Sequence, residues 1–338
     1  MSEQIVPAAA LRQMLTGFFI SQAVYVAAEL GIADLLKDGS KTSEELAKSA
    51  GADARSLYRL LRGLASVGVF EEVEPNHFAL TPIAALLRSD VPGSQRAYAI
   101  YLGGDWHWRS WGKLLHSVRT GEPAFDHVLG MDMFDYLTRH PEASAVYSEA
   151  MASRAAADNE AIVRSYDFST MRTVVDVGCG RGSLMTRILA ANPAGRGVLF
   201  DLPHVIERTR RLVNGQEIEE RCELLSGDFF EAVPEGGDAY ILQKILHDWG
   251  DDRAVAILKS CHRAMPPHAK LVVCEMVIPP GNQPFVGKLQ DLTMMVLHPG
   301  GGERTAAEFQ ALFEAAGFTL SRIVPTTTSI SMIEVVPA

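Results

Sequence analysis

The sequence predicts an α/β protein: a mostly parallel sheet with an antiparallel C-terminal edge, preceded by a helical, winged-helix N-terminal region. β-Branched runs that end in polar residues alternate with helical patterns over residues 174–244. Two C-terminal runs, residues 318–323 and 329–336, have strand patterns joined by a threonine-rich turn. At 338 residues the chain has room for two domains, which we expect to be residues 1–100 and 101–338.

The N-terminal region has the outline of a winged helix. Residues 8–36 have helical periodicity, Thr42 is an N-cap residue for a second helix, and residues 53–64 predict a third. Residues 67–70 and 78–81 then predict a short hairpin. The first helix is more apolar than a solvated surface helix needs to be, which favours a subunit interface.

A winged helix also occurs in DNA-binding regulators, so this class is a rival interpretation. The recognition helix would carry Arg55, Arg59 and Arg62. The formal net charge of −10 argues against nucleic acid and against an anionic membrane as the main partner, because phosphate groups require a basic surface. Three arginines on one helix are more often a solvated face.

The cysteines favour a reducing compartment. Cys179, Cys222, Cys261 and Cys274 show no paired metal-ligand spacing, and their number suits a cytosolic protein better than a disulfide framework. The N-terminus shows no basic segment followed by an apolar core and a cleavage site, and polar residues interrupt the most apolar early run. We expect a cytoplasmic protein with no metal ion and no membrane partner.

The most informative stretch is residues 174–182, where a β-branched run meets Asp176 and then glycines spaced G-x-G-x-G from Gly178 onward. It predicts a strand that enters a nucleotide-binding turn, and residues 183–191 have the periodicity of the following helix. Dinucleotide-binding folds place G-x-G-x-x-G and a pyrophosphate here. Asp176 gains nothing from an anion and suits a cationic ligand such as S-adenosylmethionine, which carries an ammonium and a sulfonium.

Further candidate site residues end the next predicted strands. Asp201 ends the second strand, where a carboxylate can take both ribose hydroxyls of a nucleoside. Asp228 and Phe229 end the third, where a carboxylate can accept the adenine amino group and an aromatic ring can pack on the purine. The fourth, residues 239–244, leads to His247, and ligands of open α/β sheets bind outside these strand ends.

Residues 103–166 are helical in pattern and rich in aromatic and methionine side chains. Such residues belong to cores by default, and they also form adaptable walls for flat organic ligands. A pocket for a small aromatic molecule is therefore a hypothesis at this stage. The candidate lining residues are Trp106, Trp108, Met151, Met294, Met295 and His298.

The chain resembles the S-adenosylmethionine-dependent O-methyltransferases that include plant phenolic enzymes, acetylserotonin methyltransferase and bacterial natural-product tailoring enzymes. The matching pieces run nearly end to end and are specific when taken together. Besides the winged-helix region they are residues 176–180 (DVGCG), 200–203 (FDLP), 227–230 (GDFF), 246–249 (LHDW), 273–275 (VCE) and 299–305 (PGGGERT).

The resemblance implies a Rossmann-like methyltransferase sheet and a transferase of EC class 2.1.1. His247 would be the general base, Glu275 and Glu303 would flank and orient it, and Trp249 and Phe229 would help enclose the adenine. It also implies a homodimer whose winged helix serves dimerisation and not DNA binding. The chemistry suits these residue types, because a histidine with a reference pKa of about 6.5 can take the proton of a hydroxyl as the new bond forms.

The sequence departs from the plant pattern four residues before His247, where plant relatives commonly have a lysine near the cofactor. Gln243 stands there, and Lys244 is excluded because successive strand residues face opposite sides. Cys179 and Arg181 occupy the glycine turn, and we expect Cys179 to serve packing. The predicted cofactor-binding residues are Asp176, Gly178, Gly180, Asp201, Leu202, Asp228, Phe229, Gln243 and Trp249.

The expected function is methylation of a hydroxyl of a small aromatic or polycyclic secondary metabolite, with S-adenosylhomocysteine as the second product. A competing function within the same fold uses S-adenosylmethionine only as a positive charge and catalyses hydroxylation, decarboxylation or a ring-forming rearrangement. Retention of His247 together with both glutamates favours methyl transfer.

Overall fold

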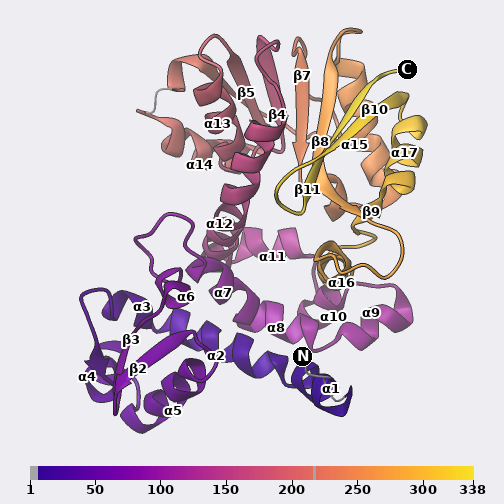
Figure 1. The fold of residues 1–338 in the computed structure, drawn as a ribbon. Coiled ribbons are helices and arrows are strands. Elements are labelled where there is room, and N and C mark those ends of the chain that lie inside the picture. The colour runs from indigo at the N-terminus through magenta and orange to yellow at the C-terminus, as the bar shows by residue number, and fades with distance from the viewer. Residues whose placement is uncertain (1–6, 216–217) are drawn as a thin grey trace, which may run out of the picture. The chain divides into compact units, whose positions relative to one another are not determined.

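The structure is a computed structural model that describes residues 7–215 and 218–338 (Figure 1). It divides into two compact units: a first unit of Met1–Trp108 and Leu137–Arg154, and a second unit of Arg109–Tyr136 and Ala155–Ala338. Three helices contribute residues to both units: α8 (Asp105–Trp111), α11 (Met133–Arg139) and α12 (Pro141–Ser165).

The first unit is mainly helical. Its other helices are α1 (Pro7–Leu15), α2 (Gly17–Glu29), α3 (Ile32–Leu35), α4 (Ser43–Ala50), α5 (Ala54–Ala65), α6 (Pro82–Ala85) and α7 (Arg96–Gly103). A small antiparallel sheet in the order β1-β3-β2 joins β1 (Lys41–Thr42), β2 (Phe70–Glu74) and β3 (His77–Leu80). The helical pattern of residues 8–36 is divided among three helices, because Gly31 takes a left-handed conformation with φ 64° after α2.

Helix α5 shows how the sequence sets the winged-helix region. It begins after Asp53, whose carboxylate caps the helix by accepting a backbone N–H at 2.8 Å. Leu57, Leu61 and Leu64 recur at helical spacing and are buried in the core of the first unit. The three arginines of this helix are exposed: Arg55, Arg59 and Arg62.

The second unit is built around an eight-stranded sheet in the order β10-β11-β8-β7-β4-β5-β6, with β9 beside β8. The strands are β4 (Thr173–Val177), β5 (Arg196–Asp201), β6 (Cys222–Ser226), β7 (Ala239–Gln243), β8 (Lys270–Ile278), β9 (Arg304–Thr305), β10 (Phe318–Pro325) and β11 (Ile330–Pro337). Strands β4 to β9 pair in parallel, whereas β10 and β11 are antiparallel. The predicted fold class is confirmed.

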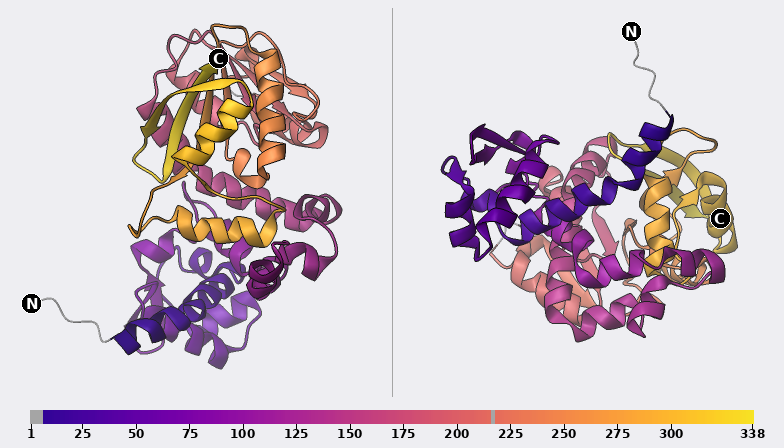
Figure 2. Two further views of the ribbon diagram at one scale, coloured as in Figure 1. Left: turned by 90° about the vertical axis from the view of Figure 1, so that its right-hand side faces the viewer. Right: turned by 90° about the horizontal axis from the view of Figure 1, so that it is seen from below.

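Helices cover both faces of this sheet. α15 (Asp251–Ala264) and α17 (Ala306–Ala315) lie side by side on one face (Figure 2), while α13 (Ser183–Ala191) and α14 (Pro203–Val213) cover the other. Adjacent strand residues enter opposite cores, since Val174 packs with α13 and Val175 packs with α15. α9 (Leu114–Thr120), α10 (Ala124–Leu129) and α16 (Gly287–Leu297) also belong to this unit. None of the described helices has the length and apolarity to cross a membrane.

The strand order reverses at β4. β5 and β6 follow on one side of β4, and β7 and β8 lie on the other. In open α/β sheets the crevice for ligands forms outside the carboxyl ends of strands at such a switch point. The glycine turn after β4 and His247 after β7 both lie at this point, so the topology places the predicted site residues at one edge of the sheet.

Candidate active site

The glycine turn joins β4 to α13. Its Gly178 N–H donates to the carbonyl oxygen of Phe200 at 2.8 Å, which ties the turn to the end of β5. Gly178 and Gly180 have positive φ angles of 76° and 53°. A Cβ on Gly178 would lie 2.5 Å from Cδ1 of Ile245, whereas a Cβ on Gly180 would meet no atom within 4 Å. Packing therefore restricts Gly178, and open space beside Gly180 lets a ligand approach the backbone.

Two carboxylates lie at this turn. Burial, and then the charge of Asp201, raise the pKa of Asp176 to about 7. Asp201 accepts hydrogen bonds from the N–H groups of Gly180 at 2.9 Å and Leu202 at 2.7 Å, and burial still raises its pKa above the ordinary value. A cationic ligand in the crevice would favour the ionised form of both carboxylates and would pair with them. The turn fits S-adenosylmethionine on these two grounds, charge and backbone access.

Asp228 and Phe229 lie just beyond β6, which ends at Ser226 and is shorter than predicted. The strand ends early because the chain turns here, with Asp228 Oδ1 accepting the N–H of Phe230 at 2.8 Å. The ring of Trp249 lies 6.2 Å from that of Phe229 and 4.8 Å from that of Phe230, in edge-to-face geometry. The structure thus brings the predicted adenine-side residues Phe229 and Trp249 into one aromatic cluster.

Strand β7 ends at Gln243, and Lys244 follows with a φ angle of 53°, uncommon for a residue with a side chain. The alternation of strand side chains stops there, so both residues reach the part of α12 in the second unit. The amides of Gln243 and Asn159 lie 2.7 Å apart, and Lys244 Nζ lies 2.5 Å from Asp158 Oδ2. Asn159 is also 3.0 Å from the Ser183 hydroxyl, which starts α13. This link between α12, β7 and α13 was not predicted.

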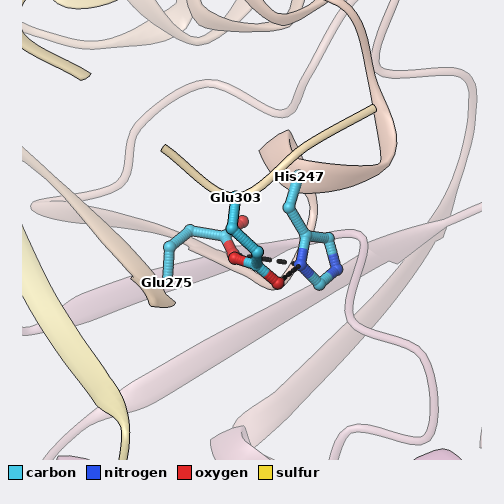
Figure 3. Close-up of side chains that lie close together, drawn as sticks. All are labelled: His247, Glu275 and Glu303. Carbon is cyan, nitrogen blue, oxygen red and sulfur yellow. Dashed lines mark hydrogen bonds and ion pairs between the residues drawn. The ribbon is translucent and has the colours of Figure 1, made fainter. Parts of the chain in front are cut away.

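His247, Glu275 and Glu303 meet from three segments of the second unit (Figure 3). His247 lies in a short 3-10 turn, Leu246–Asp248, Glu275 in the buried centre of β8, and Glu303 immediately before β9. His247 Nδ1 is 2.9 Å from Glu303 Oε1 and 3.6 Å from Glu275 Oε2. Glu275 Oε1 accepts the N–H of Leu246 at 3.0 Å. The structure therefore brings together the three residues predicted to be catalytic.

The cluster favours a positive charge on His247. Burial disfavours the imidazolium, but the charges of Glu275, Asp248 and Glu303 outweigh burial and raise the pKa of His247 to about 10. Burial raises the pKa of Glu275 to about 7. One buried oxygen of Glu275 and one of Glu303, Oε2 in each case, accept no hydrogen bond from the described residues.

A third carboxylate, Asp248, faces the other ring nitrogen of His247. Its Oδ1 is 3.4 Å from Nε2 of His247 and 3.4 Å from Nε2 of His298. His298 is buried, and burial lowers its pKa. The ring of Phe134 lies 5.4 Å from that of His298 and 6.1 Å from that of Trp249. Sequence reasoning did not assign a role to Asp248, although its place beside His247 in a tight turn is a signal for it.

The candidate lining residues fall in different units. Trp106, Trp108 and Met151 belong to the first unit, and Met294, Met295 and His298 to the second. Trp106 and Met294 are buried, as core residues are, and the ring of Trp106 packs 5.3 Å from that of Tyr101. Trp108 is more exposed and lies 6.3 Å from Phe18. Among the six, His298 has a polar contact with the cluster around His247.

Comparison with known proteins gives matches over both units. A protein-family model described as the O-methyltransferase domain matches residues 111–319, and one described as the O-methyltransferase dimerisation domain matches residues 12–90. The chain is 49% identical over 327 residues to phenazine O-methyltransferase PhzM of Lysobacter antibioticus, covering 97% of this chain and 95% of that protein. It is 40% identical over 319 residues to mitomycin biosynthesis 6-O-methyltransferase of Streptomyces lavendulae, covering 93% and 90%.

Solved structures agree with these matches. The crystal structure of LaPhzM has a TM-score of 0.95 at 48% identity and covers 98% of this chain and 100% of its own. The O-methyltransferase NcsB1, solved with S-adenosylmethionine and 2-hydroxy-5-methyl naphthoic acid, has a TM-score of 0.82 at 32% identity and covers 94% and 96%. Relatives also include a phenazine-1-carboxylate N-methyltransferase of Pseudomonas aeruginosa, 34% identical over 323 residues, covering 96% and 95%.

Proposed function

The chain belongs to the S-adenosylmethionine-dependent O-methyltransferase family with a dimerisation domain, and from that premise we propose that it methylates a hydroxyl group with His247 as general base. Family membership makes it a methyltransferase of aromatic secondary metabolites, of EC class 2.1.1. The proposal adds the acceptor atom and the role of each site residue. It takes the acceptor to be a small aromatic or polycyclic compound.

The observation that carries the proposal is the contact of His247 Nδ1 with Glu303 at 2.9 Å. A carboxylate at Nδ1 fixes the tautomer, so Nε2 has the lone pair that accepts a proton. A hydroxyl that reaches Nε2 loses its proton to His247 as its oxygen bonds to the methyl carbon. Glu303, Glu275 and Asp248 then stabilise the imidazolium. These carboxylates orient the histidine and stabilise its charged form, as the carboxylate of a hydrolase triad does.

The raised pKa of His247 has two consequences for this step. A strongly basic imidazole holds the proton firmly once it has taken it, but the free protein also carries the imidazolium at neutral pH. His247 must therefore lose that proton before the acceptor reacts. When bound, S-adenosylmethionine supplies the methyl group and a positive charge that favours the neutral imidazole by repulsion. The carboxylates around His247 oppose this repulsion and keep the pKa of His247 above its ordinary value.

The residues proposed to hold S-adenosylmethionine surround the glycine turn. Gly178 shapes the turn, Gly180 gives backbone access, and Asp176 supplies negative charge. We assign the ribose to Asp201 with Leu202, and the adenine to Asp228, Phe229 and Trp249. Gln243 completes the set at the end of β7. NcsB1, which has the same fold, was solved with S-adenosylmethionine, and this supports the choice of cofactor.

Asp176 predicts a pH dependence of cofactor binding. The pKa of Asp176 is about 7 in the folded protein, against an ordinary 3.8. Without a ligand, the free energy of unfolding therefore falls as pH rises from 3.8 to about 7. A cationic ligand favours the ionised carboxylate, so S-adenosylmethionine should bind more tightly at about pH 8 than at about pH 6, with proton release. Asp176→Asn should remove most of the increase in affinity between these two pH values. Calorimetry at both pH values measures it, and equal wild-type affinities would contradict it.

Transfer of an isotope-labelled methyl group tests the proposed function. The assay uses labelled S-adenosylmethionine with a panel of phenols and matched aromatic amines, and mass spectrometry locates the label. Label on oxygen supports the proposal. Label on nitrogen assigns this chain to the chemistry of its N-methylating relative. A changed acceptor without label points to hydroxylation, decarboxylation or rearrangement, which use the cofactor only as a charge.

The same assay addresses metal ions. Among the described residues, His247, Glu275 and Glu303 offer one ligand atom each within 4.8 Å, a spacing that a divalent cation can use. We propose that this cluster binds a proton and no metal, because Glu303 contacts Nδ1 at hydrogen-bond distance and the proton on Nδ1 fixes the tautomer that the base needs. The assay therefore contains a chelator, and methyl transfer that requires an added divalent cation contradicts this part of the proposal.

We also propose a homodimer formed through the N-terminal helices. The matched dimerisation domain covers residues 12–90. Apolar side chains of α1 and α2 between 45% and 77% exposed are Leu11, Met14, Leu15, Phe18, Phe19 and Ile20. Several large apolar side chains exposed on two successive helices are typical of a surface that a partner covers.

Two charges on this surface should separate the subunits. We expect Phe18→Glu with Phe19→Glu to give a monomer at concentrations where the wild type is a dimer, because each buried carboxylate would lose its solvation. Val67→Glu with Val73→Glu is a matched control, since both valines are also exposed in the first unit. Light scattering after gel filtration measures the mass. A dimeric Phe18/Phe19 variant would place the interface elsewhere.

A further inference from the structure

Three backbone carbonyls around His247 are held by one neighbouring segment. The N–H of Gly302 donates to the carbonyl oxygen of His247 at 2.8 Å. The guanidinium of Arg304 donates through Nη1 to the carbonyl oxygen of Leu246 at 2.8 Å and through Nη2 to that of Trp249 at 2.7 Å. The carbonyls of this tight turn have few partners within the turn itself, so their orientation depends on these donors.

Arg304 is a buried cation, with 6% of its surface exposed. Its ionic partner is Asp251, whose Oδ1 accepts from Nε at 3.1 Å and from Nη2 at 2.9 Å, while the Asp251 side chain itself is 77% exposed. Burial of a guanidinium is unfavourable unless its N–H groups are satisfied, and here carbonyls of the His247 turn supply two of the acceptors. Arg304 can therefore stay buried only while the His247 turn keeps its position.

Glu303 and Arg304 act on His247 from two sides. Adjacent residues of an extended chain point in opposite directions, so Glu303 reaches Nδ1 of the ring while Arg304 reaches the backbone. Glu303 is itself fixed, because its N–H donates to Asp291 Oδ1 at 2.8 Å. One short segment therefore positions both the ring and the backbone of His247.

The glycines before Glu303 allow this close approach. A Cβ on Gly301 would lie 2.8 Å from the carbonyl oxygen of His247 and 3.2 Å from the carbonyl carbon of Asp248, both backbone atoms that cannot turn aside. Gly300 has a φ angle of 68°, and its Cβ would lie 3.2 Å from Cα of Gly250. The segment packs backbone against backbone, which only glycine permits at these positions.

We propose that residues 300–304, here called the clamp, position His247 for proton transfer, with Arg304 and Gly301 as positioning residues. The proposal rests on the proposed role of His247 as base. Displacement of a catalytic group by about 1 Å can reduce turnover by roughly 10²-fold while ligand binding is retained. The clamp reaches the proposed cofactor contacts only through the backbone carbonyl of Trp249, which Arg304 holds. Its loss should therefore lower kcat far more than cofactor affinity.

The test compares Arg304→Met with Arg304→Lys and with Gly301→Ala. We expect Arg304→Met to lower kcat by about 30-fold to 100-fold. The affinity for S-adenosylhomocysteine, measured by calorimetry, should fall by less than about tenfold, because Arg304 also holds the carbonyl of Trp249. Arg304→Lys keeps the charge and one donor direction, so it should recover part of the loss. Gly301→Ala should lower kcat by a similar factor through displacement of the His247 peptide.

Matched controls are Arg322→Lys and Gly63→Ala. Arg322 pairs with Glu334 at 2.9 Å on another part of the sheet, and a Cβ on Gly63 meets no atom within 4 Å, so neither change should alter kcat. A kcat for Arg304→Met and Gly301→Ala within threefold of wild type would overturn the clamp. So would a fall in cofactor affinity as large as the fall in kcat, because it would mean general loss of structure. If Arg304→Met does not fold, Gly301→Ala decides the question alone.

His247→Ala, assayed in parallel, separates the clamp from the proposed function. An inactive His247→Ala with fully active clamp variants would overturn the clamp and leave the base assignment in place. A fully active His247→Ala would overturn the base assignment, whatever the clamp variants do.

Discussion

Replacement of His247 by alanine will lower turnover by about 10²-fold or more, the loss expected when a general base is removed. The loss should appear in kcat, because the proposed cofactor contacts are made by other residues and the imidazole of His247 is assigned only to proton transfer. Affinity for S-adenosylhomocysteine should change little. Initial rates with a labelled methyl donor measure the first quantity, and calorimetry with S-adenosylhomocysteine measures the second.

His268→Ala is the matched control for this experiment. His268 is another histidine beside a carboxylate, 3.5 Å from Asp238, but its side chain is 71% exposed. We expect wild-type turnover from it. Equal activity of His247→Ala and wild type would remove the base assignment, and an intact kcat after Glu303→Gln would remove the orienting role of that carboxylate.

The second large effect is expected at Asp201. Hydrogen bonds to a charged group contribute about 1.5–3 kcal/mol, so Asp201→Ala should weaken binding of S-adenosylhomocysteine by roughly 10-fold to 150-fold. Loss of the carboxylate also frees the N–H groups of Gly180 and Leu202, which loosens the turn that receives the ligand. Calorimetry with the neutral product measures the ribose contact without the sulfonium charge.

Asp167→Ala is the control for Asp201. Its carboxylate also accepts a backbone N–H, from Ser169 at 2.9 Å, and it lies on the surface of the same unit. It should bind S-adenosylhomocysteine as the wild type does. An Asp201→Ala variant with unchanged affinity would show that another group takes the ribose.

The parallel strands and their ends could be predicted because the relevant signals are local. A β-branched run followed by glycines specifies β4 and its turn, and the predicted helix over residues 183–191 has the same bounds as α13. Parallel topology then brings the ends of β4, β5 and β7 to one edge, so Asp176, Asp201 and His247 could be assigned to one crevice before any distance was known.

The parts that sequence did not predict depend on conformation at single residues or on contacts between distant segments. Lys244 was excluded by strand alternation, but its left-handed conformation lies outside the strand and directs its side chain to Asp158. Asp248 faces Nε2 of the preceding residue, His247, because both lie in one 3-10 turn, and periodicity did not predict that turn. Arg304 carries no local sign that its partners are carbonyls more than fifty residues earlier.

Backbone packing of residues 300–302 against the His247 turn has a consequence for enzyme engineering. Mutant libraries that vary this loop to change acceptor choice should yield mostly inactive enzymes, because any side chain on Gly301 meets backbone atoms. Diversity confined to Met295, a partly buried residue of α16, spares Asp291 on the same helix and so leaves the support of Glu303 unchanged. We therefore expect libraries at Met295 to retain more active enzymes than libraries at Gly301.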